Sequence, residues 1–349
     1  MMRTILTITL LAAIAAPATG QDHRVETRVV IRDATAGAYR EGEAAQRDSR
    51  EQVERTTRTL KVGANGELQL GNVSGDIVVS RGSSNDVSVE IVKTARGRTD
   101  DDAREQLQLV QVEVIERGGR AEVKAQYPQG DEMRRNNRRN INVSVAYTVS
   151  APAGIRLRAS SVSGSITVRD LKGDVSAESV SGNVQIFNGG RITSAKSISG
   201  NVEVNDTAID GTFNASSVSG SVIMRRVKAR QLDLGSISGE VLLDDVDSQE
   251  VQAQTVSGNL RFGGAVAKGG RYELSSHSGN VNVALAGSTG FEVEATSFSG
   301  SIRSDFTFSS GSGDSGNARW RKSIRGVYGD GSAILDLPTF SGSIVISKR

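Results

Sequence analysis

Apolar and polar residues alternate along most of the chain, and a Ser-Gly pair interrupts this alternation at regular intervals. Each copy has one residue, usually apolar, before the pair and an alternating segment after it, as in SVSGSVIM from Ser217 to Met224. The glycines of nine copies are Gly164, Gly182, Gly200, Gly220, Gly239, Gly258, Gly279, Gly300 and Gly342. Neighbouring glycines lie 18–21 residues apart, except for a last gap of 42. A fixed period near 20 residues indicates a solenoid.

Each period contains two short segments with the alternation of a β-strand. Val175, Ala177 and Ser179 fall on one face, and Val180, Gly182 and the apolar residues after them fall on one face with the opposite parity. A change of parity predicts a bend near Ser179-Val180. Two strands per period, stacked on their neighbours, predict an all-β protein, a parallel β-solenoid (β-helix or β-roll) with coils of 18–21 residues. The long gap predicts a degenerate or replaced coil.

The bend residues fall into rows that run from coil to coil. We expect the nine glycines on an inward or sharply bent position, because both favour a residue without a Cβ. The residue two before each glycine, His277 in the seventh copy, is predicted to lie on the core row. The serine before each glycine and the residue after it, Ser or Asn except for Glu240, are predicted to point outward and to stack in hydrogen-bonded rows, either as a structural feature or as a polar binding surface. The first row holds Ser163, Ser181, Ser199, Ser219, Ser238, Ser257, Ser278, Ser299 and Ser341.

The chain before the regular repeats is different. A positive start, Met1-Met2-Arg3, and the apolar run from Ile5 to Ala16 predict a signal peptide over residues 1–20. Residues 21–59 are polar and are predicted to be a linker or tether. Residues 60–154 contain strand patterns, a further Ser-Gly copy at Gly75 and a predicted helix from Asp100 to Leu109, so we expect an irregular β-rich region there. Residues 155–349 are the repeat solenoid, with an insert near residues 308–328.

Several segments resemble a known family in their order as well as their content. These are Leu68 to Ile77, Asp86 to Glu90, Asn142 to Tyr147 and the turn Ala151 to Gly154, followed by the Ser-Gly copies. Over Leu60 to Arg349 the chain resembles the "putative adhesin" family of bacterial exported β-strand repeat proteins, a domain of unknown function. The resemblance implies a β-solenoid protein of the cell envelope and brings no catalytic residues with it.

Composition excludes several kinds of protein. With 42 Lys and Arg against 40 Asp and Glu, the net charge is +2, which does not fit a strongly basic nucleic-acid binder. The chain has no Cys, so disulfides, Cys-ligated metals and thiol nucleophiles are excluded. After the signal, no stretch is apolar enough to span a membrane. We expect an exported protein of the periplasm, the outer envelope or the medium.

Candidate chemistry is sparse. His277 stands between two serines, but neighbours on a strand face opposite ways, so a structural role is favoured over a Ser-His pair. Asp244, Asp245 and Asp247 could hold Ca²⁺, although a solvated turn fits them better. No catalytic residue, metal site or cofactor is predicted.

The aromatic and basic residues of the insert form a candidate binding patch, made of Arg319, Trp320, Arg321, Lys322 and Arg325. The sequence favours a non-enzymatic envelope scaffold or adhesin-like binding module, with envelope polysaccharide or protein as partner. Two alternatives stay open: a carbohydrate-active lyase or hydrolase on a β-helix, and a structural envelope protein that self-assembles through solenoid ends.

Overall fold

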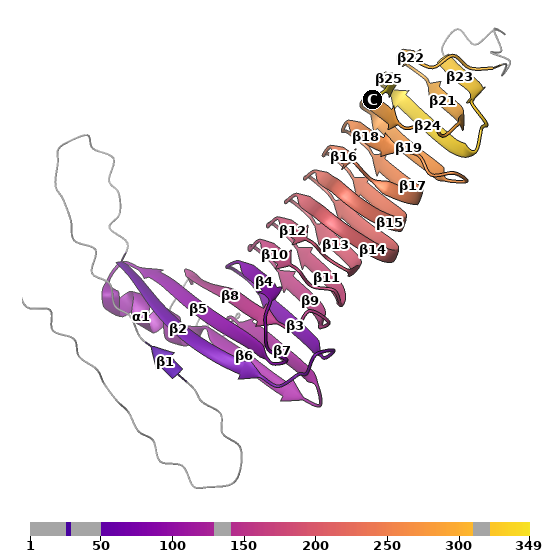
Figure 1. The fold of residues 1–349 in the computed structure, drawn as a ribbon. Coiled ribbons are helices and arrows are strands. Elements are labelled where there is room, and N and C mark those ends of the chain that lie inside the picture. Colours follow the sequence, from indigo (N-terminus) through magenta and orange to yellow (C-terminus); the bar gives the residue numbers. More distant parts are fainter. Residues whose placement is uncertain (1–25, 29–49, 129–140, 310–321) are drawn as a thin grey trace, which may run out of the picture.

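Strands make up nearly all of the regular structure in the protein. The computed structural model describes residues 26–28, 50–128, 141–309 and 322–349. Within these residues the chain forms strands and one helix, α1 (Asp100–Leu109), stacked into a long rod (Figure 1). The predicted all-β class is therefore confirmed. None of the described residues belongs to a helix that is long and apolar enough to cross a membrane.

Two ladders of strands run along the rod, and most rungs contribute one strand to each. Ladder 1 consists, in pairing order, of β6 (Gln111–Arg117), β7 (Arg120–Gln126), β3 (Glu67–Asn72), β9 (Arg156–Ser161), β11 (Asp174–Ser179), β13 (Arg191–Ser197), the second halves of β14 (Val202–Ser217) and β15 (Val222–Ser236), β17 (Asp247–Thr255), β19 (Arg271–Ser278), β24 (Ala333–Ser341), β21 (Phe291–Ser297) and β23 (Lys322–Tyr328).

Ladder 2 follows the same rungs on the other side of the core. It consists, in pairing order, of β1 (Glu26–Arg28), β2 (Arg50–Leu60), β5 (Val87–Gly97), β8 (Val143–Ala151), β4 (Ile77–Arg81), β10 (Ile166–Arg169), β12 (Val184–Phe187), the first halves of β14 and β15, β16 (Val241–Asp244), β18 (Leu260–Ala265), β20 (Val281–Ala286), β25 (Ile344–Lys348) and β22 (Ile302–Ser304).

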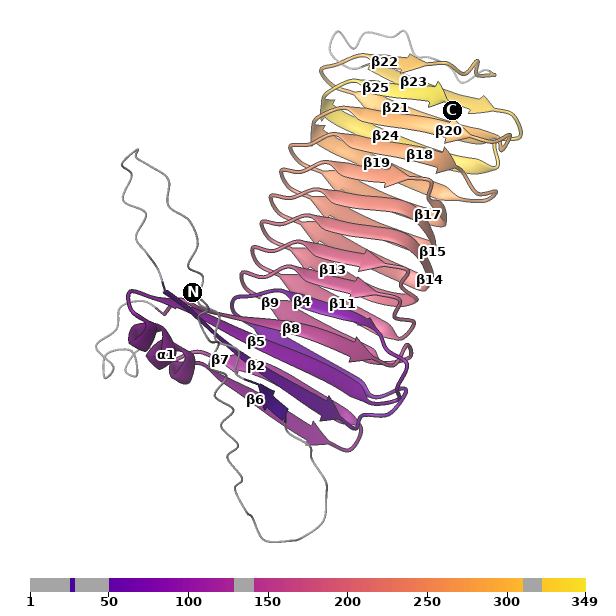
Figure 2. The ribbon, with the colours of Figure 1, turned by 60° about the vertical axis from the view of Figure 1, so that its left-hand side comes forward.

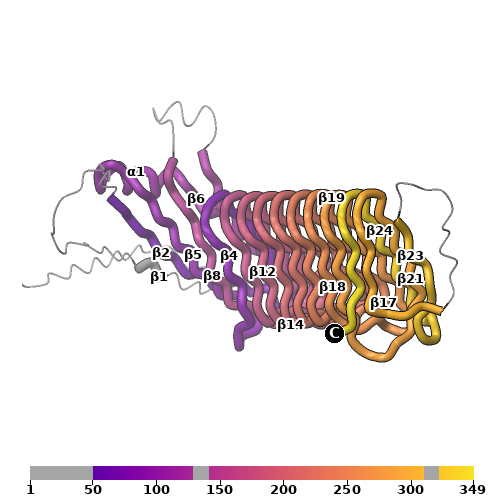
Figure 3. Tube along the Cα trace, turned by 90° about the horizontal axis from the view of Figure 1, so that it is seen from above, coloured from indigo at the N-terminus to yellow at the C-terminus, as the bar shows by residue number. Residues whose placement is uncertain are grey.

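Pairing in the middle of the rod is parallel and joins equivalent positions of successive repeats. Val184 of β12 lies opposite Val202 of β14, and Val202 lies opposite Val222 of β15. The chain passes along ladder 1, bends at the Ser-Gly pair, returns along ladder 2 and turns into the next rung, which gives a β-helix-like stack (Figure 3).

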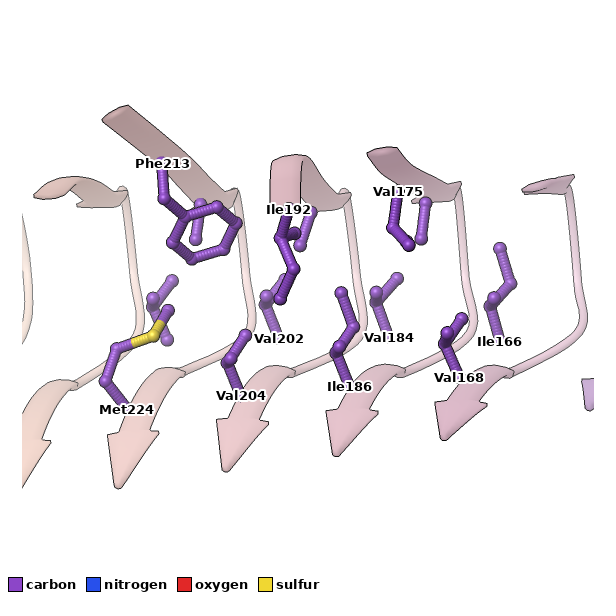
Figure 4. Packing of buried hydrophobic residues seen from close by; sticks show 14 of the residues in the cluster. Ile166, Val168, Val175, Val184, Ile186, Ile192, Val202, Val204, Phe213 and Met224 are labelled. Carbon is purple, nitrogen blue, oxygen red and sulfur yellow. The ribbon is translucent and has the colours of Figure 1, made fainter. Parts of the chain in front are cut away.

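The core lies between the two ladders. Figure 4 shows Val175, Ile192 and Phe213 of ladder 1 pointing toward Val184 and Ile186 of ladder 2. These side chains are at most 1% exposed. Because strand side chains alternate between faces, the apolar alternation in the sequence places one apolar set inside. Each fully buried Val, Ile or Phe contributes about 1.5–3 kcal/mol to folding.

Antiparallel strands close the N-terminal end of the rod. β2 pairs along its whole length with β5, so residues 50–60 are a strand, and the prediction that the linker extends to residue 59 is wrong there. Thr59 and Leu60 lie opposite Ser88 and Val87, which makes β2 part of the sheet. The predicted helix is α1, and the Thr99 Oγ1 accepts a hydrogen bond from the Asp102 N–H (3.1 Å) as its N-cap. The predicted signal peptide lies outside the described residues.

The C-terminal rung lies out of sequence order. β24 pairs with β19 on one side and β21 on the other, and β25 pairs with β20 and β22. Figure 2 shows these yellow strands interleaved with the orange ones. The 42-residue gap between Gly300 and Gly342 therefore reflects an inserted rung, whereas the sequence predicted a degenerate or replaced coil. Antiparallel β23 then covers β21 at this end of ladder 1.

Candidate binding surface

A buried hydroxyl shapes the bend in every regular rung. The Ser217 Oγ accepts a hydrogen bond from the Gly220 N–H (2.9 Å) and donates one to the Gly200 carbonyl oxygen of the preceding rung (2.8 Å). The same position, three before the glycine, is a buried Ser or Thr in all nine copies: Ser161, Ser179, Ser197, Ser217, Ser236, Thr255, Ser276, Ser297 and Thr339. The motif is thus Ser/Thr-x-Ser-Gly, and the role of its first residue was not predicted from the sequence.

The bend needs glycine because the rungs nearly touch there. A Cβ on Gly220 would lie 2.1 Å from the Gly200 carbonyl oxygen, and one on Gly239 would lie 2.1 Å from that of Gly220. Both distances are far below van der Waals contact. Backbone from consecutive rungs therefore occupies the space that any other side chain would need.

The turn from Ser179 to Gly182 leaves its two middle residues on the outside. Ser179 and Gly182 are buried, whereas Val180 and Ser181 between them are exposed. The prediction that the residue before Ser-Gly belongs to the core row is therefore wrong, for His277 as for the others. The hydrogen bond from the Gly182 N–H to the Ser179 Oγ (2.9 Å) closes the turn, so the change of parity spans these two residues instead of falling between Ser179 and Val180.

These outward residues form a continuous apolar stripe along the rod. In stacking order, the stripe is Val73, Val162, Val180, Ile198, Val218, Ile237, Val256, His277, Phe340 and Phe298. Its nine apolar side chains are 39–50% exposed. They account for nine of the eleven large exposed apolar residues in the described part of the chain, so the exposure is concentrated on this line.

Backbone hydrogen bonds hold the stripe residues one above another. The Ser219 N–H donates to the Ile198 carbonyl oxygen (2.8 Å), and the Ser238 N–H donates to that of Val218 (2.9 Å). At the C-terminal end the rings stack face to face, with centroids 5.0 Å apart for His277 and Phe340 and 4.8 Å apart for Phe340 and Phe298. The stripe is therefore as regular as the strands that carry it.

A shallow groove lies beside the stripe on the ladder 1 side. One section of about 600 Å³ is bordered by stripe residues from Val218 to Phe340, and a second of about 480 Å³ is bordered by those from Val162 to Val218. The two sections share Ser197, Ser216 and Val218, so they are continuous. Small residues such as Ser216, Gly235 and Ser275 form the floor, which explains why the surface is hollowed there.

The stripe and its borders carry almost no charge. Among the sixty residues from two before to three after each stripe residue, four are charged: Asp76, Glu178, Lys196 and Glu240. The whole chain is 23% charged. Depletion of charge around exposed apolar side chains is typical of the centre of a protein–protein interface.

The other border of the stripe is a row of hydrogen-bonded polar side chains. The Asn183 Oδ1 accepts from the Asn201 N–H (2.8 Å), and the Asn201 Oδ1 accepts from the Ser221 N–H (2.8 Å). Asn259 and Asn280 repeat this arrangement further along. The predicted rung-to-rung bonding of this row is confirmed, with backbone N–H groups as the donors. These amides stabilise the stack, which leaves the apolar stripe as the unpartnered feature.

The structure describes two of the five residues of the basic patch expected from the sequence. Arg319, Trp320 and Arg321 lie outside the described residues. Lys322 begins β23 and is exposed, and the Arg325 Nη2 lies 3.4 Å from the Glu294 Oε2 of β21. The patch stays a prediction.

The aspartate cluster forms ion pairs across turns. Asp244 lies 3.2 Å from Arg349, and Asp247 lies 3.0 Å from Lys228. Asp245 adopts a positive φ of 57°, a turn conformation that Asp tolerates. Nowhere in the described ranges are three or more His, Asp or Glu side chains gathered to hold a metal ion.

A row of three carboxylates crosses the C-terminal rungs of ladder 1. Glu273 lies opposite Asp336, and Asp336 lies opposite Glu294. Burial, together with the charge of Glu294, raises the pKa of Asp336, and Arg271 opposes this shift. The folded protein therefore binds a proton at Asp336 more tightly than the unfolded chain does.

We expect Asp336→Asn to be more stable than the wild type at pH 7 in dilute solution. Because the pKa of Asp336 is higher in the folded state than in the unfolded state, the wild type loses no stability through this group below the unfolded-state pKa, near 3.9. Its stability then falls as the pH rises through the folded-state pKa. Asn cannot ionise, so the difference should shrink toward zero at pH 3. Asp336 is partly exposed, and the gain should stay below about 1 kcal/mol.

Urea unfolding at pH 7 and pH 3 measures this effect. Asp233→Asn is the matched control, because Asp233 occupies the equivalent row between the uncharged Asn214 and Gln252. Equal pH dependence in both variants would contradict the prediction.

The largest pKa shifts in the described residues belong to two tyrosines with structural roles, Tyr127, which is partly buried, and Tyr147, which is fully buried. Burial raises the pKa of Tyr127 to about 12, and its hydroxyl donates to the Val143 carbonyl oxygen (3.1 Å). Tyr147 has a pKa raised by burial and donates to the Gly71 carbonyl oxygen (3.2 Å). Both phenols remain protonated and face the core, so neither is placed to transfer a proton to a ligand.

Comparison with known proteins identifies a family and distant structural relatives. The family model described as Toastrack DUF4097 matches residues 28–347. A structure described as a putative lipid binding protein from Parabacteroides distasonis is 15% identical, with 84% of this chain and 96% of that chain covered and a TM-score of 0.43. One described as a putative adhesin from Bacteroides fragilis is 13% identical, with 84% and 97% covered and a TM-score of 0.39. No curated protein matches the sequence.

Proposed function

The chain belongs to the Toastrack DUF4097 family, and on that premise we propose that it is an exported, non-enzymatic β-solenoid that serves as a scaffold or adhesin-like binding module of the cell envelope. Its coils of 18–21 residues would give it a rigid rod, and the apolar stripe with its groove would be the contact surface. The observation that carries the proposal is the concentration of exposed apolar side chains on one uncharged line.

A protein partner fits this surface better than an envelope polysaccharide does. Sugar hydroxyls need hydrogen-bonding groups, whereas the Asn amide oxygens beside the stripe already accept bonds from neighbouring rungs. Val180, Ile198 and Ile237 offer only apolar contact. Burying such side chains contributes about 25 cal/mol for each Å² removed from water, and few charged groups at the border have to be desolvated.

Assembly through the ends of the rod is less well supported. Antiparallel β23 covers β21 at one end of ladder 1, and antiparallel β6 and β7 end the same ladder at the other. These antiparallel strands interrupt the parallel register of the repeats, so a second rod could not continue the stack as a further regular rung. The long side of the rod is therefore the surface that we assign to binding.

We expect Ile237→Asp to lower the association of the protein with isolated cell envelopes about tenfold. The substitution places a charge in the middle of the apolar stripe, and a loss of about 1.4 kcal/mol corresponds to this factor. Ile237 is 50% exposed, so folding should be little affected.

Co-sedimentation with envelope fractions, with a thermal melt of each variant, measures this effect. Val345→Asp is the matched control, because Val345 is an exposed apolar residue on ladder 2 away from the stripe. If Ile237→Asp binds envelopes as well as the wild type does while both variants are folded, the stripe is not the contact surface. Alanine at Arg319, Trp320 and Arg321 tests the basic patch as the alternative contact.

A further inference from the structure

We propose that the apolar stripe binds the stripe of a second copy of this chain, with the two rods side by side and antiparallel. This inference rests on the proposed function in one respect: it takes the stripe to be a binding surface. It goes further by naming the alignment and the occupant, so that the envelope protein bound through the stripe would be a second copy of this chain.

The dimensions of the surface suit a stable dimer. Ten stripe residues at a rung spacing of about 4.8 Å make a line roughly 43 Å long. Six residues across each bend, from two before to three after the stripe residue, would span about 17 Å if they were extended, and the turn within them makes the surface narrower than that. The product, about 700 Å² on each copy, is therefore an upper bound, and it falls within the about 600–1,000 Å² that each partner contributes to a standard stable interface.

The spacing of the stripe favours another rod of the same construction. Its side chains project at the interval of paired β-strands, held by backbone hydrogen bonds such as that from the Ser219 N–H to the Ile198 carbonyl oxygen. A second copy presents apolar side chains at the same interval, so the contacts repeat in step along the whole line. Only four charged residues, Asp76, Glu178, Lys196 and Glu240, lie among the sixty around the stripe, which limits the repulsion between like charges when two identical surfaces meet.

Side-chain size along the stripe selects the antiparallel alignment. The N-terminal rungs carry valines, and the last three carry His277, Phe340 and Phe298. With the rods antiparallel and fully overlapped, each bulky ring faces a valine. The facing pairs are Val73 with Phe298, Val162 with Phe340, Val180 with His277, Ile198 with Val256, and Val218 with Ile237. A parallel pair would set rings against rings at one end and leave a gap at the other.

Sedimentation equilibrium of the purified protein tests the dimer. We expect the wild type to be a dimer whose dissociation constant rises at least tenfold with Ile237→Asp and changes little with Val345→Asp. A monomeric wild type at all concentrations would overturn the proposal. Flotation of a monomeric wild type with phospholipid vesicles, or its capture on envelope polysaccharide, would do the same and would identify another occupant.

Single cysteines test the alignment, because the chain has no cysteine of its own. Val162→Cys and Phe340→Cys chains, mixed and oxidised, should form a mixed disulfide, whereas neither should link to itself. Self-linking of Phe340→Cys without the mixed product would show parallel rods and would overturn the alignment.

The two proposals fail in different ways. If the wild type is monomeric but Ile237→Asp still loses envelope binding, the second copy is the wrong occupant and the proposed function stands. If the wild type dimerises through the stripe but does not associate with envelopes, the dimer stands and the proposed function fails.

Discussion

Gly220→Val should destabilise the protein by about 3 kcal/mol or more. Overpacking in a rigid core costs about 1–3 kcal/mol, and here the added Cβ would lie 2.1 Å from the backbone oxygen of Gly200. A side chain could rotate away, but a carbonyl fixed in the stack can move only if the rungs separate. The hydrogen bond from the Ser217 Oγ to the same oxygen would then lengthen as well.

Thermal and urea melts followed by far-ultraviolet circular dichroism measure this loss. Ser219→Val is the matched control, because Ser219 is the exposed neighbour of Gly220 in the same bend and should change stability by no more than about 0.5 kcal/mol. Similar melts for both variants would mean that the rungs have room for a side chain at the glycine position.

Ser217→Ala should cost about 2 kcal/mol or more, although it removes a single oxygen atom. The variant deprives the Gly220 N–H and the Gly200 carbonyl oxygen of the hydrogen bonds that the Ser217 Oγ makes with them in the buried bend. A buried polar group left without a partner costs about 1–3 kcal/mol. The effect should exceed that of removing an exposed hydroxyl by a wide margin.

Two further variants isolate the role of the hydroxyl. Ser217→Thr should keep most of the stability, because Thr255 and Thr339 make the bond to the preceding rung at the equivalent position. Ser219→Ala should be nearly neutral, because Ser219 is exposed. If alanine and threonine at residue 217 unfold at the same urea concentration, the hydroxyl is not what stabilises the bend.

Part of the candidate surface was visible in the sequence in another form. The row of residues before each Ser-Gly pair was recognised, but alternation alone assigned it to the core. Alternation predicts faces correctly only while the strand continues. The turn from Ser179 to Gly182, like its equivalents in the other rungs, ends the strand. The Ser or Thr three before each glycine was the available signal, because a hydroxyl at that spacing can cap the glycine N–H as in other Ser/Thr turns.

The C-terminal part shows a different limit. The sequence contains nine equivalent copies, and nothing in Ser341-Gly342 distinguishes a last rung from an inserted one. Its place between β19 and β21 depends on pairing between segments that are distant in the sequence. β2 is a similar case, because its polar sequence becomes a strand only by pairing with β5.

The sequence by itself determined the length of the rungs, the all-β class, the strands that fill the core and the need for glycine at the bend. These features repeat locally, and each follows from the period of side chains along a strand or from the space that a Cβ occupies. Only the tertiary structure decided that Val180 and its equivalents face solvent, that they join into one uncharged line, and that the last rung lies between two earlier ones. Those features arise from contacts between rungs, which the order of residues within any one repeat does not specify.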